Sequence, residues 1–131
     1  MFTAEEIEIL CSEEIRRAIE DNIERKPTDI ALDSRVPYAS IVATQVKNLQ
    51  KTRTKLPSYY AVRAIVPTLA YEQSSSEACA LRKRLEGDSV LDLTCGLGVD
   101  AFALSKRFRR VVTIERNESV ATVARENFRR L

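Results

Sequence analysis

The stretch from Val90 to Asp100 constrains the fold more than any other part of the chain. An apolar run there passes into a loop with two glycines, Gly96 and Gly98, and a helical pattern begins directly afterwards. A second apolar run, 111–114, is followed at once by the acid Glu115. Short apolar runs that alternate with helical segments are typical of parallel strands joined by a crossover helix. The pattern predicts a strand, a tight loop, a helix and a second strand with a carboxylate at its tip.

The glycine loop is suited to binding a ligand. Gly96 and Gly98 have no Cβ, so the backbone can turn sharply and approach a bound molecule closely. The loop leads to a helix N-terminus at Val99, where unpaired N–H groups favour polar and negative groups. Glu115 follows Gly96 by 19 residues, and its carboxylate could accept both ribose hydroxyls of an adenosine. These features predict an adenosine-bearing cofactor.

Two cofactors compete for this loop. The spacing Gly96-x-Gly98-x-x-Ala101 fits the fingerprint of a dinucleotide site such as that for NAD or FAD. S-adenosylmethionine has no pyrophosphate but has a charged amino-acid end that needs partners, and Asp92 could hold its ammonium directly or through a water. Asp92 therefore favours S-adenosylmethionine. A third interpretation is a helical interaction module in which the glycines only form a turn.

The rest of the chain predicts further helices before this unit. A capping box opens at Thr3, and a possible break lies near Ser12. The remaining expected helices are 28–33, 38–53, a short one from Pro57 that ends by Pro67, 76–86, 99–107 and 117–131, with strands at 89–93 and 110–115. Asp100 is expected to cap the helix after the glycine loop or to contact the cofactor.

This order of elements predicts a fold class and a division of the chain. A helical domain, residues 1–72, precedes the first β-α-β-α of a Rossmann-like α/β sheet, residues 73–131. Two parallel strands leave most of a sheet uncovered. We therefore expect an incomplete sheet whose open side the N-terminal helices or a second copy of the chain could cover.

The charge of the chain is concentrated in its middle. Residues 34–71 contain six bases and no acid, whereas residues 1–33 contain ten acids and four bases. RNA could bind the basic residues Lys47, Lys51, Arg53 and Lys55 through its phosphates. In the alternative interpretation, these bases form a solvated helix face and pair with the acidic first helices.

Several site classes have little support in the sequence. No run approaches the length of a membrane span, and the acidic start lacks a signal-peptide pattern. Three widely spaced cysteines and no histidine do not form a metal-binding pattern. We expect reduced thiols, a cytoplasmic protein, and a buried Cys95 that contributes its backbone rather than a reactive thiol.

The segment from Asp92 to Phe102, together with Ile114-Glu-Arg-Asn117, resembles motifs I and II of class I S-adenosylmethionine-dependent methyltransferases, and in particular RNA-modifying members. Upstream, the segments 53–57 and 72–78 resemble a group of bacterial methyltransferases that carry a THUMP-like domain. The family's catalytic loop after strand four would lie beyond residue 131. The resemblance therefore implies a fragment that binds cofactor weakly at most and does not turn over, and its catalytic residues are unknown.

The resemblance can be transferred residue by residue. Asp92, Gly96 and Gly98 match motif I, and Glu115 matches the ribose-binding acid. Gln73 and Ser75 lie where related enzymes help to hold the cofactor's carboxylate, although a polar loop that caps the next helix would look the same. Thr94 departs from the glycine that many members have. The predicted cofactor-binding residues are Gln73, Ser75, Asp92, Thr94, Cys95, Gly96, Gly98 and Glu115.

Overall fold

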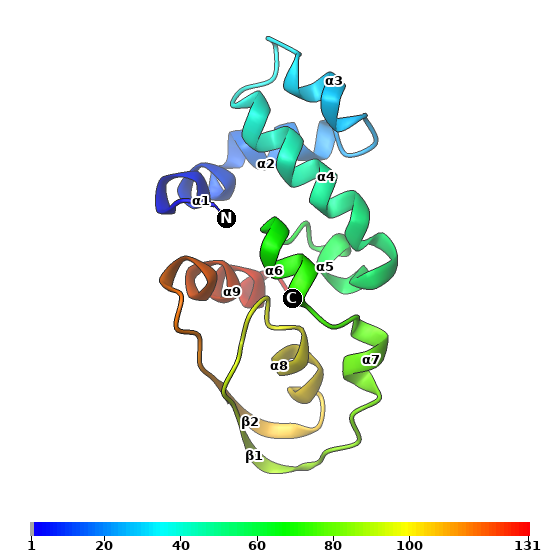
Figure 1. Ribbon diagram of the computed structural model, residues 1–131, viewed down its shortest axis with the longest axis vertical. Helices are drawn as coiled ribbons and strands as arrows, with labels where there is room; N and C mark the ends of the chain where they lie inside the picture. Colours follow the sequence, from blue (N-terminus) through cyan, green and yellow to red (C-terminus); the bar gives the residue numbers. More distant parts are fainter. Residues whose placement is uncertain (1) are drawn as a thin grey trace.

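A computed structural model describes residues 2–131 as an elongated molecule, with helices at one end and a small parallel sheet at the other (Figure 1). The chain begins with α1 (Ala4–Cys11), α2 (Glu13–Asp21), α3 (Pro27–Ala31), α4 (Ala39–Lys55), α5 (Pro57–Ala61), α6 (Thr68–Gln73) and α7 (Glu77–Leu81). It continues with β1 (Gly87–Asp92), α8 (Val99–Leu104), β2 (Phe108–Thr113) and α9 (Glu118–Arg130). In the described part of the chain, no helix is both long and apolar enough to cross a membrane.

Local sequence signals start the N-terminal helices. The Thr3 hydroxyl accepts the Glu6 N–H at 3.1 Å, and the Glu6 carboxylate accepts the Thr3 N–H at 2.8 Å, which confirms the predicted capping box. Ser12 divides the first helical stretch as expected, because its hydroxyl caps α2. Pro27 and Pro57 each stand in the first turn of a short helix.

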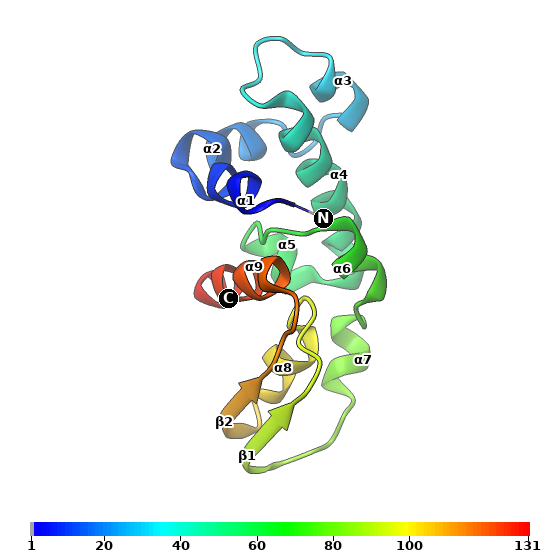
Figure 2. The same ribbon diagram turned by 60° about the vertical axis from the view of Figure 1, so that its left-hand side comes forward.

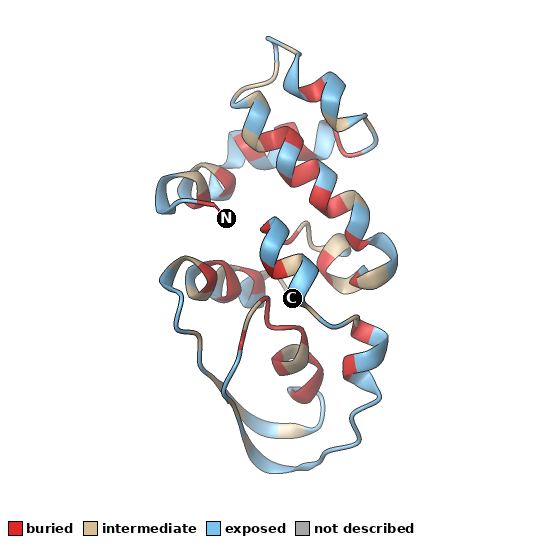
Figure 3. Ribbon diagram, viewed as in Figure 1, coloured by how far each residue is buried: buried red, intermediate tan, exposed pale blue. Residues whose placement is uncertain are grey.

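The two strands pair in parallel, with Leu91 opposite Val112, and α8 packs against β2. This is the predicted β-α-β-α order, and Figure 2 shows both strands running toward α9. One face of the sheet carries exposed apolar residues, and Figure 3 shows most of both strands in the pale colour of exposed residues. The exposed apolar residues of this face are Leu91, Leu93, Val112 and Ile114. The N-terminal helices therefore do not cover this face.

An extended segment, 64–66, runs through the middle of the molecule and is held by buried side-chain amides. Gln45 of α4 donates to the Ala64 carbonyl at 2.7 Å and accepts the Val66 N–H at 3.1 Å. Asn127 of α9 accepts the Ile65 N–H and donates to the Ile65 carbonyl, both at 2.8 Å. Because these backbone groups are buried, the amides replace the ladder partners that a sheet would provide.

This segment joins the two predicted parts of the chain in one core. Buried Leu49 of α4, Leu97 of the glycine loop and Val123 of α9 belong to the same apolar cluster. The division into a helical domain, 1–72, and the start of a Rossmann-like domain, 73–131, stays a prediction, and the apolar packing is continuous between the two parts.

Several local expectations differ from the structure, among them the helix expected at 99–107, which ends at Leu104. The helix from Pro57 ends at Ala61, because Arg63 has a positive φ of 51° and the chain then runs extended to Pro67. The helix α6 was not expected, since its six residues are too few for a helical apolar stripe to be recognised. The helix α7 ends at Leu81 rather than at 86.

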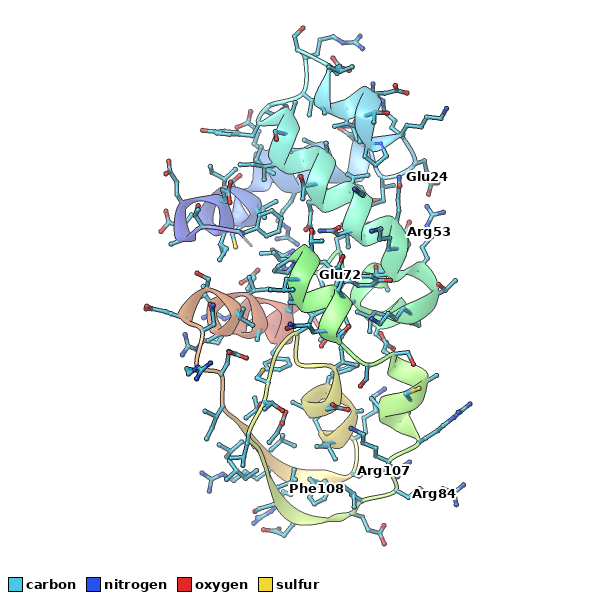
Figure 4. The ribbon with its side chains drawn as sticks, in the orientation of Figure 1. Glu24, Arg53, Glu72, Arg84, Arg107 and Phe108 are labelled. Carbon is cyan, nitrogen blue, oxygen red and sulfur yellow. The ribbon has the colours of Figure 1, made fainter. Side chains whose placement is uncertain are left out.

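Most of the basic middle segment is engaged by the protein itself. Arg53 pairs with Glu24, as Figure 4 shows, and Arg63 forms a pair with Glu20 at 2.7 Å. The Lys55 ammonium donates to the Tyr71 carbonyl at 2.8 Å. The predicted pairing with the acidic N-terminal part of the chain is thus present for Arg53 and Arg63, whereas Lys47 and Lys51 remain exposed on α4.

We expect Asn127→Leu to destabilise the protein by about 2–5 kcal/mol, because it leaves the buried Ile65 N–H and carbonyl without partners. Thr122→Ala, on the exposed side of the same helix, is the matched control and should cost under about 1 kcal/mol. Urea unfolding followed by circular dichroism measures both. Equal unfolding midpoints for the two variants would show that the amide does not hold the segment.

Candidate functional site

A cavity of about 400 Å³ lies at the carboxyl ends of the two strands, between the glycine loop, the α6–α7 loop and the start of α9. The residues that line it are Leu69, Ala70, Gln73, Ser74, Ser75, Thr94, Cys95, Gly96, Leu97, Val99, Asp100, Glu115, Asn117 and Val120. Open α/β sheets place their ligands in this position. Figure 2 shows how the chain leaves both strands toward this end of the sheet.

The two glycines of the loop face different surroundings. Gly96 has a φ of +53°, and a Cβ added there would meet nothing within 4 Å, so its backbone borders open space. Gly98 has a φ of +87°, and an added Cβ would come within 2.5 Å of the Phe128 ring. The backbone at Gly96 is therefore open to the cavity, while Gly98 allows close packing of the loop against α9.

The loop is anchored from below by Tyr59 of α5. The fully buried Tyr59 hydroxyl donates to the Leu97 carbonyl at 3.0 Å, and its ring meets Phe102 edge-on. Burial raises the pKa of this phenol well above its ordinary value, so it stays protonated as a donor. The helix α5 thus helps to fix the position of the glycine loop.

Glu115 closes over the loop from the tip of the second strand. One oxygen of its carboxylate accepts the Gly96 N–H at 3.0 Å, and the other accepts the Asn117 N–H at 2.8 Å. The side chain is half-buried and lines the cavity. Its remaining lone pairs give the cavity strong acceptors at the place where the sequence predicts ribose hydroxyls.

Asp92 holds the base of the loop and does not line the cavity. Its Oδ1 accepts the Thr94 N–H at 3.1 Å, and its Oδ2 accepts the Thr113 hydroxyl at 3.0 Å. The carboxylate therefore links the end of the first strand to the second strand. In this arrangement the Asp92 carboxylate does not border the cavity where a cofactor ammonium would lie. It does hold the glycine loop in position.

Six of the eight predicted residues line the same cavity: Gln73, Ser75, Thr94, Cys95, Gly96 and Glu115. Asp92 and Gly98 lie behind them and shape the loop. Cys95 is buried as predicted; burial raises the pKa of its thiol, and its N–H donates to the Ile114 carbonyl at 2.9 Å. The thiol thus stays protonated, and the backbone N–H of Cys95 ties the glycine loop to the end of the second strand.

Other lining residues were not predicted from the sequence. Leu69 and Ala70 come from α6, whose shortness concealed it. Asn117 lines the cavity and also caps α9 by accepting the Val120 N–H at 3.1 Å. Its position two residues after Glu115 was the sequence feature that could have identified Asn117 as a lining residue. Asp100 borders the cavity and pairs with Lys83 at 2.9 Å instead of capping α8.

The lining has a negative character. It contains the carboxylates of Asp100 and Glu115 and no lysine or arginine. Within residues 2–131, no group of three or more His, Cys, Asp and Glu side chains is arranged to hold a metal ion. The cavity is therefore suited to an organic ligand with hydroxyls and positive charge rather than to a bare anion.

The chain resembles a solved structure along its whole length. No protein-family model and no curated protein matches it. The crystal structure of a "putative methyltransferase from Porphyromonas gingivalis W83" superimposes with a TM-score of 0.80 at 34% sequence identity, covering 100% of this chain and 33% of that one. The chain thus spans about a third of that protein and has the fold of the matching part. This comparison supports a methyltransferase in general.

We expect Gly98→Ala to destabilise the protein more than Gly96→Ala. Both carry a positive φ that costs a side chain about 1–2 kcal/mol, but only at position 98 would the Cβ collide with Phe128. Thermal unfolding of the two variants measures the difference. Adding Phe128→Ala to Gly98→Ala should recover part of the lost stability. A larger loss of stability in Gly96→Ala than in Gly98→Ala would contradict the packing role of Gly98.

We expect Tyr59→Phe to cost about 1 kcal/mol at neutral pH through loss of the bond to Leu97. The pKa of Tyr59 is raised by folding, so its contribution to stability is present below about pH 10 and is lost as pH rises above that value. Urea midpoints at neutral and alkaline pH should therefore fall less steeply in the variant than in the wild type. Tyr38→Phe, which removes an exposed hydroxyl, should keep the wild-type pH dependence.

Proposed function

We propose that this chain contains the cofactor-binding part of a class I S-adenosylmethionine-dependent methyltransferase. The observation that carries the proposal is the cavity in which Gln73, Ser75, Gly96 and Glu115 converge from three separate segments of the chain. These residues were chosen from sequence motifs alone, and their meeting in one cavity is what a shared binding site would require. The full-length similarity to part of a methyltransferase supports the same conclusion.

The charge of the cavity favours S-adenosylmethionine over a dinucleotide. S-adenosylmethionine carries a sulfonium and an ammonium against one carboxylate, so its net charge is positive. The cavity offers the ligand the carboxylate of Glu115, which pairs with no cation in the part of the chain that the structure describes, and that of Asp100, which is paired with Lys83. The pyrophosphate of NAD or FAD would meet this lining without a positive partner other than the short helix α8, which makes a dinucleotide the weaker candidate.

The residues of the cavity suit the parts of this cofactor. Glu115 would accept the ribose hydroxyls, and Gln73 and Ser75 would donate to the carboxylate of the methionine end. Thr94, Cys95 and Gly96 would contribute backbone to the floor of the site. Asp92 and Gly98 would keep the loop in shape, with a water bridging Asp92 to the ammonium. When bound, the cofactor supplies an already activated methyl group, so the protein mainly has to align the acceptor.

The finer parts of the proposal concern the whole protein. We propose that it belongs with the methyltransferases that carry a THUMP-like domain, modifies RNA in the cytoplasm, and draws its catalytic residues from outside the segment 1–131. The matching structure is about three times as long as this chain. The apolar sheet face formed by Leu91, Leu93, Val112 and Ile114 would then be covered by further parts of the sheet domain or by a second copy.

The support for RNA is narrower than the sequence suggested. Arg53 and Lys55 are engaged by Glu24 and Tyr71, which leaves Lys47 and Lys51 of the proposed segment. These two line a shallow groove between α3 and α4. We propose that RNA phosphates contact this groove.

Titration with S-adenosylhomocysteine and, in parallel, with NAD tests the cofactor. Backbone amide NMR signals of Gly96 and Asn117 are the readout, because both N–H groups bond to Glu115. We expect shifts with S-adenosylhomocysteine only. Shifts with NAD alone would favour an oxidoreductase, and no shift with either ligand would leave the glycine turn a purely structural feature.

We expect Glu115→Gln to weaken S-adenosylhomocysteine binding by about tenfold, since a charged acceptor for two hydroxyls becomes a neutral one. The glutamine oxygen can still accept the Gly96 N–H, so the loop should keep its shape. Glu118→Gln, an exposed carboxylate in the first turn of α9, is the matched control. Equal affinities of both variants would remove Glu115 from the site.

We expect single-stranded RNA to bind weakly at low salt and to lose affinity as salt rises. Replacing Lys47 or Lys51 with Gln should each lower the slope of log affinity against log salt by about one. Fluorescence anisotropy of a labelled oligonucleotide measures this slope. Absence of binding at low salt would remove the RNA part of the proposal without affecting the cofactor site.

A further inference from the structure

A second cavity, of about 670 Å³, lies where α2 and the end of α5 meet the end of α9. Its lining residues are Cys11, Glu13, Arg16, Arg17, Ile19, Glu20, Ala61, Val62, Arg63 and Arg130. None of them lines the cofactor cavity. The site is therefore distinct in position and, with four arginines, opposite in character.

Arg130 contributes a buried donor that has no partner. Its side chain is only 8% exposed; Nε donates to the Glu126 carboxylate and Nη1 donates to the Arg63 carbonyl, at 2.8 and 2.7 Å. Its Nη2 is the one buried side-chain nitrogen or oxygen within residues 2–131 that has no hydrogen-bond partner. Such an unmade bond costs about 1–3 kcal/mol, so an added acceptor would be stabilised here.

The other charges around this cavity leave a positive excess. Glu20 pairs with Arg63 in two hydrogen bonds, and Glu13 pairs with Arg17. In the described chain, no carboxylate pairs with Arg16. Against four arginines stand two lining glutamates and the neighbouring Glu126, so the local charge is positive even with every carboxylate ionised.

The Cys11 thiol faces the Arg130 guanidinium without satisfying it. Burial raises the pKa of this thiol and the nearby Glu126 raises it further, while Arg130 and Arg16 act in the opposite direction. A neutral thiol is a weak acceptor. The Nη2 atom of Arg130 therefore still lacks an oxygen acceptor. Cys11 lies close enough to Arg130 and Arg16 for its reactivity to report on what binds there.

We propose that this cavity binds an oxyanion of the phosphate type, held by the guanidinium groups of Arg130 and Arg16. Planar guanidinium donors match the geometry of phosphate oxygens, and a charged acceptor gives the stronger kind of hydrogen bond. The inference does not depend on methyl transfer. The phosphate group could be a free one or part of a nucleic-acid strand, and the two sources can be separated by experiment.

Alkylation of Cys11 by iodoacetamide, followed by mass spectrometry on the whole chain, is the first test. Inorganic phosphate is added at constant ionic strength, balanced with chloride. We expect phosphate to slow alkylation of Cys11 because the bound anion covers the thiol and disfavours the reactive thiolate. Cys79, an exposed cysteine outside the cavity, should react at an unchanged rate. Equal slowing at both cysteines, or at neither, would overturn the proposal.

Two variants locate the effect. Arg16→Gln should need about ten times more phosphate for the same protection, which is the loss of one charge-assisted contact, while Arg84→Gln, an exposed arginine at the far end of the molecule (Figure 4), should behave as the wild type. Arg130→Lys keeps the positive charge but removes the planar, forked set of guanidinium donors. If circular dichroism shows that this variant is folded, phosphate should protect its Cys11 less than in the wild type. Unchanged protection in Arg16→Gln would overturn the proposal whether or not the Arg130 variant folds.

A short single-stranded RNA in place of inorganic phosphate distinguishes the source. Protection of Cys11 at a lower concentration of phosphate groups than free phosphate requires would assign the site to a strand phosphate. Protection by inorganic phosphate alone would assign it to a small free anion. Either result supports the oxyanion site. If neither RNA nor inorganic phosphate protects Cys11, the proposal is wrong.

Discussion

The amide clamp on the segment 64–66 is the constraint on which the rest of the structure depends. The buried side chains of Gln45, Asn48 and Asn127 bond the backbone of this segment from α4 on one side and α9 on the other. A buried extended strand without a sheet would otherwise leave its N–H and carbonyl groups unpaired, which costs more than the net gain of most contacts. The clamp makes burial of Ala64, Ile65 and Val66 possible and thereby joins the helices to the sheet unit.

The position of the candidate site follows from this junction. Because α9 is fixed by Asn127, its Phe128 ring is held against Gly98, and the same junction places Tyr59 under the Leu97 carbonyl. The glycine loop is thus held between α5 and α9 and cannot spread. The helix α6 follows the clamped segment and leads into the α6–α7 loop, so Gln73 at the end of α6 and Ser75 in the loop line the same cavity as the glycine loop. The N-terminal helices thus serve as a scaffold for the site.

The sequence predicted the elements whose signals are local. The strands, the glycine loop and the caps at Thr3 and Ser12 depend on residues within a few positions of each other, and the structure has them with ends shifted by about two residues. Strand ends shifted because pairing of Gly87 with Phe108 extends the ladder at its beginning. The helix α6, the early end of α5 and the clamp could not be predicted. They depend on bonds between residues such as Asn127 and Ile65, 62 positions apart, and nothing in the local pattern of α9 distinguishes a clamping asparagine from a solvated one.

The same distinction explains why the sequence brings the candidate residues together in outline but does not show which of them border the cavity. Motif spacing identifies residues that the fold brings to one loop, so six of eight proved to line one cavity. Spacing does not show which groups already have partners. Both carboxylates accept one hydrogen bond on each oxygen, Asp92 from Thr94 and Thr113 and Glu115 from Gly96 and Asn117. A carboxylate held by two backbone N–H groups is oriented before any ligand arrives, so Glu115 can accept hydroxyls with little reorganisation. Asp92 keeps a free lone pair on each oxygen as well, but it does not line the cavity, so of these two carboxylates only Glu115 borders it and Asp92 supports the loop from behind.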